Sequence, residues 1–144
     1  MRVPKRKSVK HKPMKDGGAI YLTQEGIDKA ERQLGRIERD LPRAAEEVKR
    51  TGENGDFSEN FEYQEAKAKL RRMLHKQLVL KDRLSRVVLI ETNDSGGPAQ
   101  LGSKVLVEVG GEKKEFEILG PHDSDPMQGR ISNKSPLGMA LVGR

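Results

Sequence analysis

Two runs of apolar residues, each repeating every seven residues, constrain the fold of this chain most tightly. In the first run the repeating positions are Ile27, Leu34, Leu41 and Val48, with Ala30, Ile37 and Ala44 following three residues later. In the second run they are Tyr63, Leu70, Gln77 and Leu84, with Ala66, Met73, Leu80 and Val87. This spacing is typical of a coiled-coil seam. We predict one helix over residues 24–51, capped by Thr23, and a second that starts near Asp56 and continues to Val87.

Turn-forming residues separate the two runs. The segment reads Thr51-Gly52-Glu53-Asn54-Gly55-Asp56, and two glycines with an asparagine favour a turn. Two matched seams joined by a short loop predict an antiparallel helical hairpin over residues 20–91. Because the two stripes can cover each other, no partner helix is required and we expect a monomer. An intermolecular coiled coil is the alternative.

The segment after the hairpin predicts a small β domain. Residues 92–99 have the composition of a linker. Alternating valines predict a strand over residues 104–109, Gly110-Gly111 suits a tight turn, and residues 114–119 form the next strand. Ile131 and residues 137–142 complete a domain over residues 100–144. The fold class is therefore α+β. Since the domain has only about 45 residues, we expect it to lean on the helices.

Composition narrows the classes of function. There is no cysteine, so disulfide frameworks and thiolate zinc sites are excluded, and His11, His75 and His122 show no metal-ligand spacing. No apolar run is long enough to cross a membrane, and we expect a soluble cytoplasmic protein. The net charge of +6 arises in residues 1–19, a basic and disordered arm by composition. This arm either contacts phosphate or an acidic protein surface, or is a solvated tail.

The turn between the helices carries two carboxylates, Asp56 and Glu59, three residues apart at a predicted helix start. Magnesium prefers oxygen ligands and usually binds through one or two carboxylates together with phosphate and water. The pair is thus half of a Mg²⁺ site. Alternatively Asp-x-x-Glu is a capping box, in which each side chain bonds the backbone of the other residue. Phe57 in the middle of the turn favours a tip that inserts into another molecule.

Motifs in three regions of the sequence then indicate a family. The tip sequence Gly55-Asp56-Phe57-Ser58-Glu59-Asn60, with Tyr63 three residues on, closely resembles the tip motif of the bacterial Gre transcript-cleavage factors. Residues 21–26 (Tyr-Leu-Thr-Gln-Glu-Gly) resemble the start of their first helix. Residues 120–126 (Gly-Pro-His-Asp-Ser-Asp-Pro) and 132–141 resemble signatures of their C-terminal domain. The resemblance covers residues 20–144, with the motifs in the family's order.

This resemblance implies a fold and a mechanism. It implies a coiled-coil hairpin followed by a domain with the antiparallel β fold of FK506-binding proteins. It also implies that the hairpin enters the secondary channel of bacterial RNA polymerase, where Asp56 and Glu59 would help to hold a second Mg²⁺ jointly with the enzyme. The polymerase then hydrolyses the backtracked RNA 3′ end by two-metal phosphoryl chemistry. Phe57, Ser58, Asn60 and Tyr63 match the motif and shape the tip or contact RNA. The resemblance implies that the factor is not itself an enzyme, and we expect the isolated chain to bind no cofactor tightly.

The sequence departs from the family pattern at both ends. The basic arm before Tyr21 is longer than the family pattern, and the chain stops at Arg144, where members usually continue into another strand. Whether the C-terminal sheet is complete, and how strongly it docks at the channel entrance, is therefore left open.

A basic flank follows the tip on the second helix. Residues 66–81 contain no acid and carry six cations, namely Lys67, Lys69, Arg71, Arg72, Lys76 and Lys81. We expect Lys67, Lys69, Arg71 and Arg72 in particular to attract RNA phosphates. The alternative is a solvated face whose cations pair with the acid-rich first helix.

Other classes of function compete with this prediction. A channel-binding inhibitor or scaffold protein of RNA polymerase would need no cleavage activity, although the acidic pair argues against it. A prolyl isomerase needs an aromatic-lined pocket, and Phe116 is the only aromatic residue after Tyr63. A general nucleic-acid-binding coiled coil would need no acidic tip.

Overall fold

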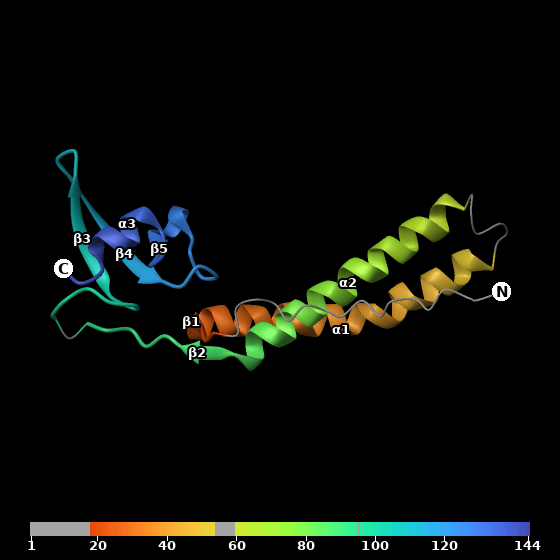
Figure 1. The fold of residues 1–144 in the computed structure, drawn as a ribbon. Coiled ribbons are helices and arrows are strands. Elements are labelled where there is room, and N and C mark those ends of the chain that lie inside the picture. The colour runs from red at the N-terminus through yellow and green to blue at the C-terminus, as the bar shows by residue number, and fades with distance from the viewer. Residues whose placement is uncertain (1–17, 54–59, 95) are drawn as a thin grey trace, which may run out of the picture.

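The structure, a computed structural model, describes residues 18–53, 60–94 and 96–144. Figure 1 shows a long pair of helices with a small β domain beside the end where the first helix begins. Strand β1 (Ile20–Leu22) leads into α1 (Gln24–Gly52), and α2 (Phe61–Ser85) leads into β2 (Val87–Leu89). The predicted α+β arrangement of a helical hairpin followed by a β domain is confirmed.

The two helices pack against each other along the predicted seams. All seam positions that fall within α1 and α2 are buried or half-buried. Ala30, Ala44, Ala66 and Leu80 are the most enclosed of them, each at most 8% exposed. The helices run antiparallel in Figure 1, as a short connection requires. The hairpin therefore buries its own apolar stripes within one chain, as predicted.

The ends of the helices differ from prediction in two places. Thr23 caps α1 as expected, its side chain accepting from the Gly26 N–H. However, α2 begins at Phe61 with Asn60 as its cap, so the predicted start near Asp56 is wrong. Val87 was expected on the helical seam, but α2 ends at Ser85 and Val87 lies in β2. The backbone becomes extended there because β2 hydrogen-bonds to another strand.

That partner is β1, and the pairing holds the base of the hairpin together. β1 and β2 are parallel, with Ile20 opposite Val87 and Leu22 opposite Leu89. The Ile20 N–H donates to the carbonyl of Arg86 at 3.0 Å, and the Ile90 N–H donates to the carbonyl of Leu22 at 2.8 Å. Leu22 is only 2% exposed. The chain therefore enters and leaves the hairpin side by side.

The β domain is built on a three-stranded sheet in the order β3–β4–β5. β3 (Lys104–Val109) and β4 (Glu112–Leu119) form the predicted antiparallel hairpin, and both turn glycines have positive φ. β5 (Arg130–Ser132) pairs parallel to β4, so the expectation of a purely antiparallel sheet is wrong. A parallel neighbour requires a longer crossover, here residues 120–129, which include the short helix η1 (Pro126–Gln128).

The core of the β domain is small. Ile118 and Leu119 are fully buried, and Ala99 and Ile131 are nearly so. α3 (Pro136–Leu141) follows β5, and its Leu141 packs against this cluster. Within the described ranges, no helix is both long and apolar enough to cross a membrane.

Candidate functional site

Asn60 joins the ends of both helices at the base of the tip. Its Nδ2 donates to the carbonyl of Thr51 at 2.7 Å, and its Oδ1 accepts from the backbone N–H of Tyr63 at 3.0 Å. Thr51 is 1% exposed, and its hydroxyl donates to the Glu47 carbonyl at 2.8 Å. A single amide thus satisfies a carbonyl at the end of α1 and an N–H at the start of α2.

The predicted metal ligands Asp56 and Glu59, together with Phe57 and Ser58, lie outside the described residues. Their roles therefore stay predictions. The cap of the second helix, in contrast, is a described residue. Asn60 occupies that position, in an extended conformation with φ −78° and ψ 95°. The acidic pair is therefore not needed to cap α2.

Aromatic residues flank the start of α2. Tyr63 is half-buried on the seam, and the Lys67 ammonium lies 5.0 Å from the centre of its ring, within range of a cation–π contact. Phe61 is 81% exposed, the first residue of the helix. Phe61 lies off the heptad positions, so the seam pattern gives no signal for it. An exposed aromatic residue beside the tip is a candidate contact to a partner.

The basic flank of α2 divides into paired and unpaired cations. Lys81 reaches across to Glu38 of α1 at 3.1 Å, and Arg72 pairs with Glu65 of its own helix at 3.2 Å. Three more cations are exposed and make no ion pair among the described residues: Lys69, Arg71 and Lys76. The alternative of pairing with the first helix is thus correct for Lys81, whereas these three remain available to an anion.

Two cations of α1 extend this flank into a groove that the sequence did not predict. Cations from both helices rim a cleft of about 620 Å³ beside the seam: Arg36, Arg43, Lys69, Arg72 and Lys76. Its floor includes Ala44 and Ala66, two small buried residues, and the acids Asp40 and Glu47 also line it. Only the three-dimensional pairing of the helices brings Arg36 and Arg43 beside the basic flank. The groove is a candidate contact surface for a phosphate backbone.

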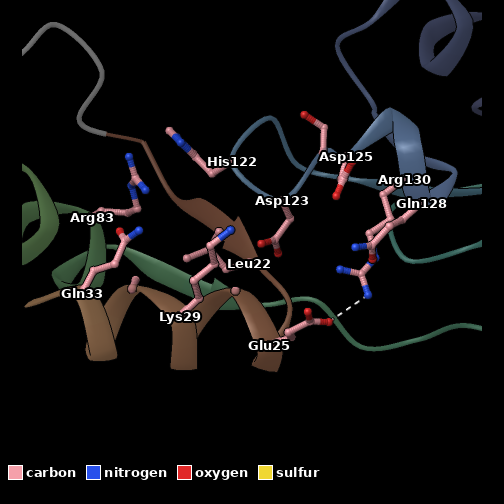
Figure 2. A pocket seen from close by; sticks show the side chains of 13 residues that line it. Leu22, Glu25, Lys29, Gln33, Arg83, His122, Asp123, Asp125, Gln128 and Arg130 are labelled. Atoms are coloured by element: carbon pink, nitrogen blue, oxygen red, sulfur yellow. Dashed lines mark hydrogen bonds and ion pairs between the residues drawn. The ribbon is translucent and has the colours of Figure 1, made fainter.

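A second cleft, of about 310 Å³, lies where the β domain meets the base of the hairpin (Figure 2). The loop after β4 places Asp123 over the start of α1. Asp123 Oδ2 accepts from the backbone N–H of Thr23 at 2.6 Å and from its hydroxyl at 2.9 Å. Arg83, from the end of α2, lines the same cleft.

An ion pair forms the other side of this junction. Arg130 Nη2 donates to Glu25 Oε2 at 2.8 Å, drawn as the dashed line in Figure 2, and Arg130 Nε lies 3.6 Å from Glu117 Oε2. The hydrogen bond from Arg130, followed by its positive charge, lowers the pKa of Glu25. Partial burial, with the nearby Arg83 guanidinium, lowers the pKa of His122. Both groups therefore keep their neutral-pH charge state, Glu25 ionised and His122 neutral.

The described ranges contain no group of three or more histidine, cysteine, aspartate or glutamate side chains that could hold a metal ion. The described residues supply three features around the predicted tip. These are a tip base fixed by Asn60, a basic groove along the hairpin, and a junction to the β domain.

Comparison with known proteins gives the same family for both parts of the chain. Residues 20–89 match the family model for the N-terminal part of a transcription elongation factor, and residues 94–144 match the model for the GreA/GreB C-terminal part. Transcription elongation factor GreA of Thermosipho africanus is 37% identical over 129 residues, covering 88% of this chain and 82% of that protein. The GreA of Clostridioides difficile is 36% identical, covering 91% and 85%.

A solved structure, that of the GreA factor homolog 1 protein of Thermus thermophilus, is also similar. It is 29% identical with a TM-score of 0.47, covering 88% of this chain and 84% of that one. The family models and the GreA relatives together span the hairpin and the β domain. The chain therefore belongs to the GreA/GreB family of transcription elongation factors.

Proposed function

We propose that this factor binds bacterial RNA polymerase through its secondary channel and stimulates the enzyme's own cleavage of backtracked RNA 3′ ends. The observation that carries the proposal is the hairpin itself. α1 has 29 residues, a rod about 43 Å long at about 1.5 Å per residue. At its far end Asn60 ties the two helices together on either side of Asp56 and Glu59. A narrow rod ending in two carboxylates suits delivery of charge to a recessed catalytic centre.

Asp56 and Glu59 would hold a Mg²⁺ ion jointly with the polymerase. Carboxylate oxygens are the ligands Mg²⁺ prefers, but two of them fill only part of an octahedral shell. We therefore expect weak Mg²⁺ binding and no RNA hydrolysis by the isolated chain. When bound, such an ion supplies positive charge at the reacting phosphate. The protein's own contribution is to carry the carboxylates there and hold them in place.

The remaining parts of the hairpin would guide the RNA. The groove rimmed by Arg36, Arg43 and Lys69 presents positive charge along the rod, where extruded RNA phosphates would pass. Phe61, exposed at the base of the tip, offers a flat apolar surface on which a base can stack. The β domain would dock at the channel entrance.

The test replaces Asp56 by Asn and Glu59 by Gln in one variant. Because Asn60 caps α2, we expect this variant to remain folded and to compete for the channel as the native protein does. Amide oxygens carry no formal charge, so most transcript cleavage should be lost. The matched control is Glu62→Gln, which removes an exposed carboxylate from the first turn of α2 and should leave cleavage unchanged.

Cleavage of a stalled, backtracked elongation complex is the measurement, with thermal unfolding and competition for the channel alongside. Full cleavage by the double variant would exclude the metal role of the tip. A native protein that occupies the channel without shortening the transcript would instead be the inhibitor or scaffold considered above.

A further inference from the structure

Two sequence motifs that the proposed cleavage mechanism does not use meet at one place in the structure. Residues 21–26 start the hairpin, and residues 120–126 form the loop after β4. Figure 2 shows Asp123 of that loop directed at the start of α1. The backbone of the loop is equally close, because a Cβ on Gly120 would lie 2.6 Å from the carbonyl oxygen of Tyr21. The two motifs therefore form a single junction between the domains.

Asp123 is the centre of this junction. One of its carboxylate oxygens accepts both the N–H and the hydroxyl of Thr23, and the Thr23 hydroxyl in turn accepts the Gly26 N–H at 3.1 Å. The residue that caps α1 is thus itself held by the β domain. A carboxylate at this end also complements the positive end of the helix dipole.

The first turn of α1 is shaped to receive this carboxylate. A Cβ on Gly26 would overlap Asp123 Oδ1 and Oδ2, so only glycine leaves room for it. Glycine in a helix is otherwise unfavourable compared with alanine. The position is therefore explained by the contact with the other domain.

Arg130 supplies a second attachment. Its guanidinium forms an ion pair with Glu25, the residue before Gly26. Glu117 of β4 contacts the same guanidinium from within the β domain. Two separate attachments to the first turn of α1 resist rotation, whereas one contact alone would act as a pivot.

A long rod magnifies any looseness at its base. With a rod about 43 Å long, a rotation of about 10° at the junction moves the tip by about 7.5 Å, and about 1.3° moves it by 1 Å. Displacing reacting groups by about 1 Å can cost about 100-fold in rate. We propose that Asp123 and Arg130 are positioning residues that set the angle between the β domain and the hairpin, and so place the carboxylate tip in the polymerase. This inference rests on the proposed function.

The angle can be measured without polymerase. The chain has no cysteine, so Lys49→Cys near the tip and Lys113→Cys on β4 allow two spin labels to be attached cleanly. We expect a narrow distance distribution in the otherwise native protein and a broad one with Asp123→Ala. Gly26→Ala should broaden it too, because the new methyl group displaces the carboxylate. Gly26→Ala should add nothing in an Asp123→Ala background, where the obstruction is gone.

Transcript cleavage provides the functional measurement. Asp123→Ala should lower the maximal cleavage rate at saturating factor by about tenfold or more, with less than about a threefold change in the half-saturating concentration. Asp123→Asn keeps a hydrogen-bond acceptor for Thr23 and should recover part of the rate. The control is Ser124→Ala, since the Ser124 hydroxyl bonds Pro121 within its own loop.

The outcomes separate this inference from the proposed function. An unchanged distance distribution in Asp123→Ala would show that Asp123 does not set the angle between the domains. A broad distribution together with a native maximal cleavage rate would show that this angle does not place the tip. If the native protein stimulates no cleavage, the proposed function fails, and the distances alone still decide whether Asp123 fixes the angle.

Discussion

Replacing Asn60 by alanine removes two hydrogen bonds at once, one to the Thr51 carbonyl and one from the Tyr63 N–H. Losing a helix cap costs roughly 0.5–2 kcal/mol, and the second bond adds about 1 kcal/mol. We therefore expect Asn60→Ala to lower the free energy of unfolding by about 1–3 kcal/mol in denaturant titrations. Asn60→Asp keeps the acceptor for Tyr63 but lacks the donor to Thr51, and should lie between. If Asn60→Ala unfolds at the same denaturant concentration as the native protein, the two hydrogen bonds of Asn60 do not stabilise the fold as described.

His122 gives the protein a small dependence of stability on pH. Partial burial lowers its pKa below the usual 6.5. The unfolded chain therefore takes up the proton at a higher pH than the folded chain does. The stability contributed by neutral His122 is present above pH 6.5 and is lost as the pH falls below it. Since most of the His122 side chain remains accessible to solvent, the loss of stability should be small.

The corresponding measurement is an NMR titration of the His122 imidazole, which should reach its midpoint below pH 6.5. His122→Gln should reduce the change in the unfolding midpoint between about pH 7 and 5. A titration midpoint at or above 6.5 would show that the loop does not shield the ring.

The choice between Asp56 and Asn60 shows what local sequence could not decide. Both are good capping residues, four positions apart. The capping-box pattern favours Asp56, because Glu59 follows at the required spacing, whereas Tyr63 follows Asn60. Asn60 caps the helix because its amide also donates to Thr51, which a carboxylate cannot do. That bond crosses between helices, so no pattern within the second helix predicts it.

Among the elements, α2 lends itself to a test of the basic groove. Reversing Lys69 and Lys76, two cations on the rim of the groove, to glutamate should weaken stimulation of backtracked complexes, because they make no ion pair among the described residues. The effect should be larger at about 50 mM than at about 200 mM salt, where screening is stronger. The matched control is Lys81→Glu, whose charge already faces Glu38. Equal effects of both variants at every salt concentration would reduce the groove to a solvated face.

The long helices were predictable and the short strands were not. A seam repeats over three or more heptads, so each helix shows its period within its own residues. β1 and β2 have three residues each, too few to show alternation, and Ile20 pairs with Val87 across the whole hairpin. The parallel pairing of β5 with β4 was missed for the same reason.

At the scale of the whole molecule, the sequence indicated the motifs at residues 21–26 and 120–126. It did not indicate that they contact each other in the fold. Asp123 and Thr23 are 100 positions apart, and neither is unusual in its own segment. Gly26 was the one indication of this contact in the sequence. Glycine is unfavourable within a helix, so a glycine in the first turn suggests close packing against another segment. The tip carboxylates, in contrast, were identified from sequence alone, and their role stays a prediction.

Because β1 and β2 pair at the base of the hairpin, the length of the hairpin can be changed by shortening or lengthening both helices together. Since α1 begins and α2 ends at one paired base, removing one heptad from each, residues 34–40 and 77–83, should keep the two seams matched. The tip would retreat by about 10.5 Å. We expect a folded protein that still engages polymerase and has lost cleavage, which circular dichroism, competition and the cleavage assay would show together.

The length of the hairpin and the direction in which its tip faces cannot be changed independently. Each residue added to or removed from a helix turns the end by about 100° as well as shifting it by about 1.5 Å. A whole heptad is the smallest change that leaves the tip facing within about 20° of its original direction. The reach of a factor built on this plan can therefore change only in coarse steps, and any finer correction has to come from the junction at its base.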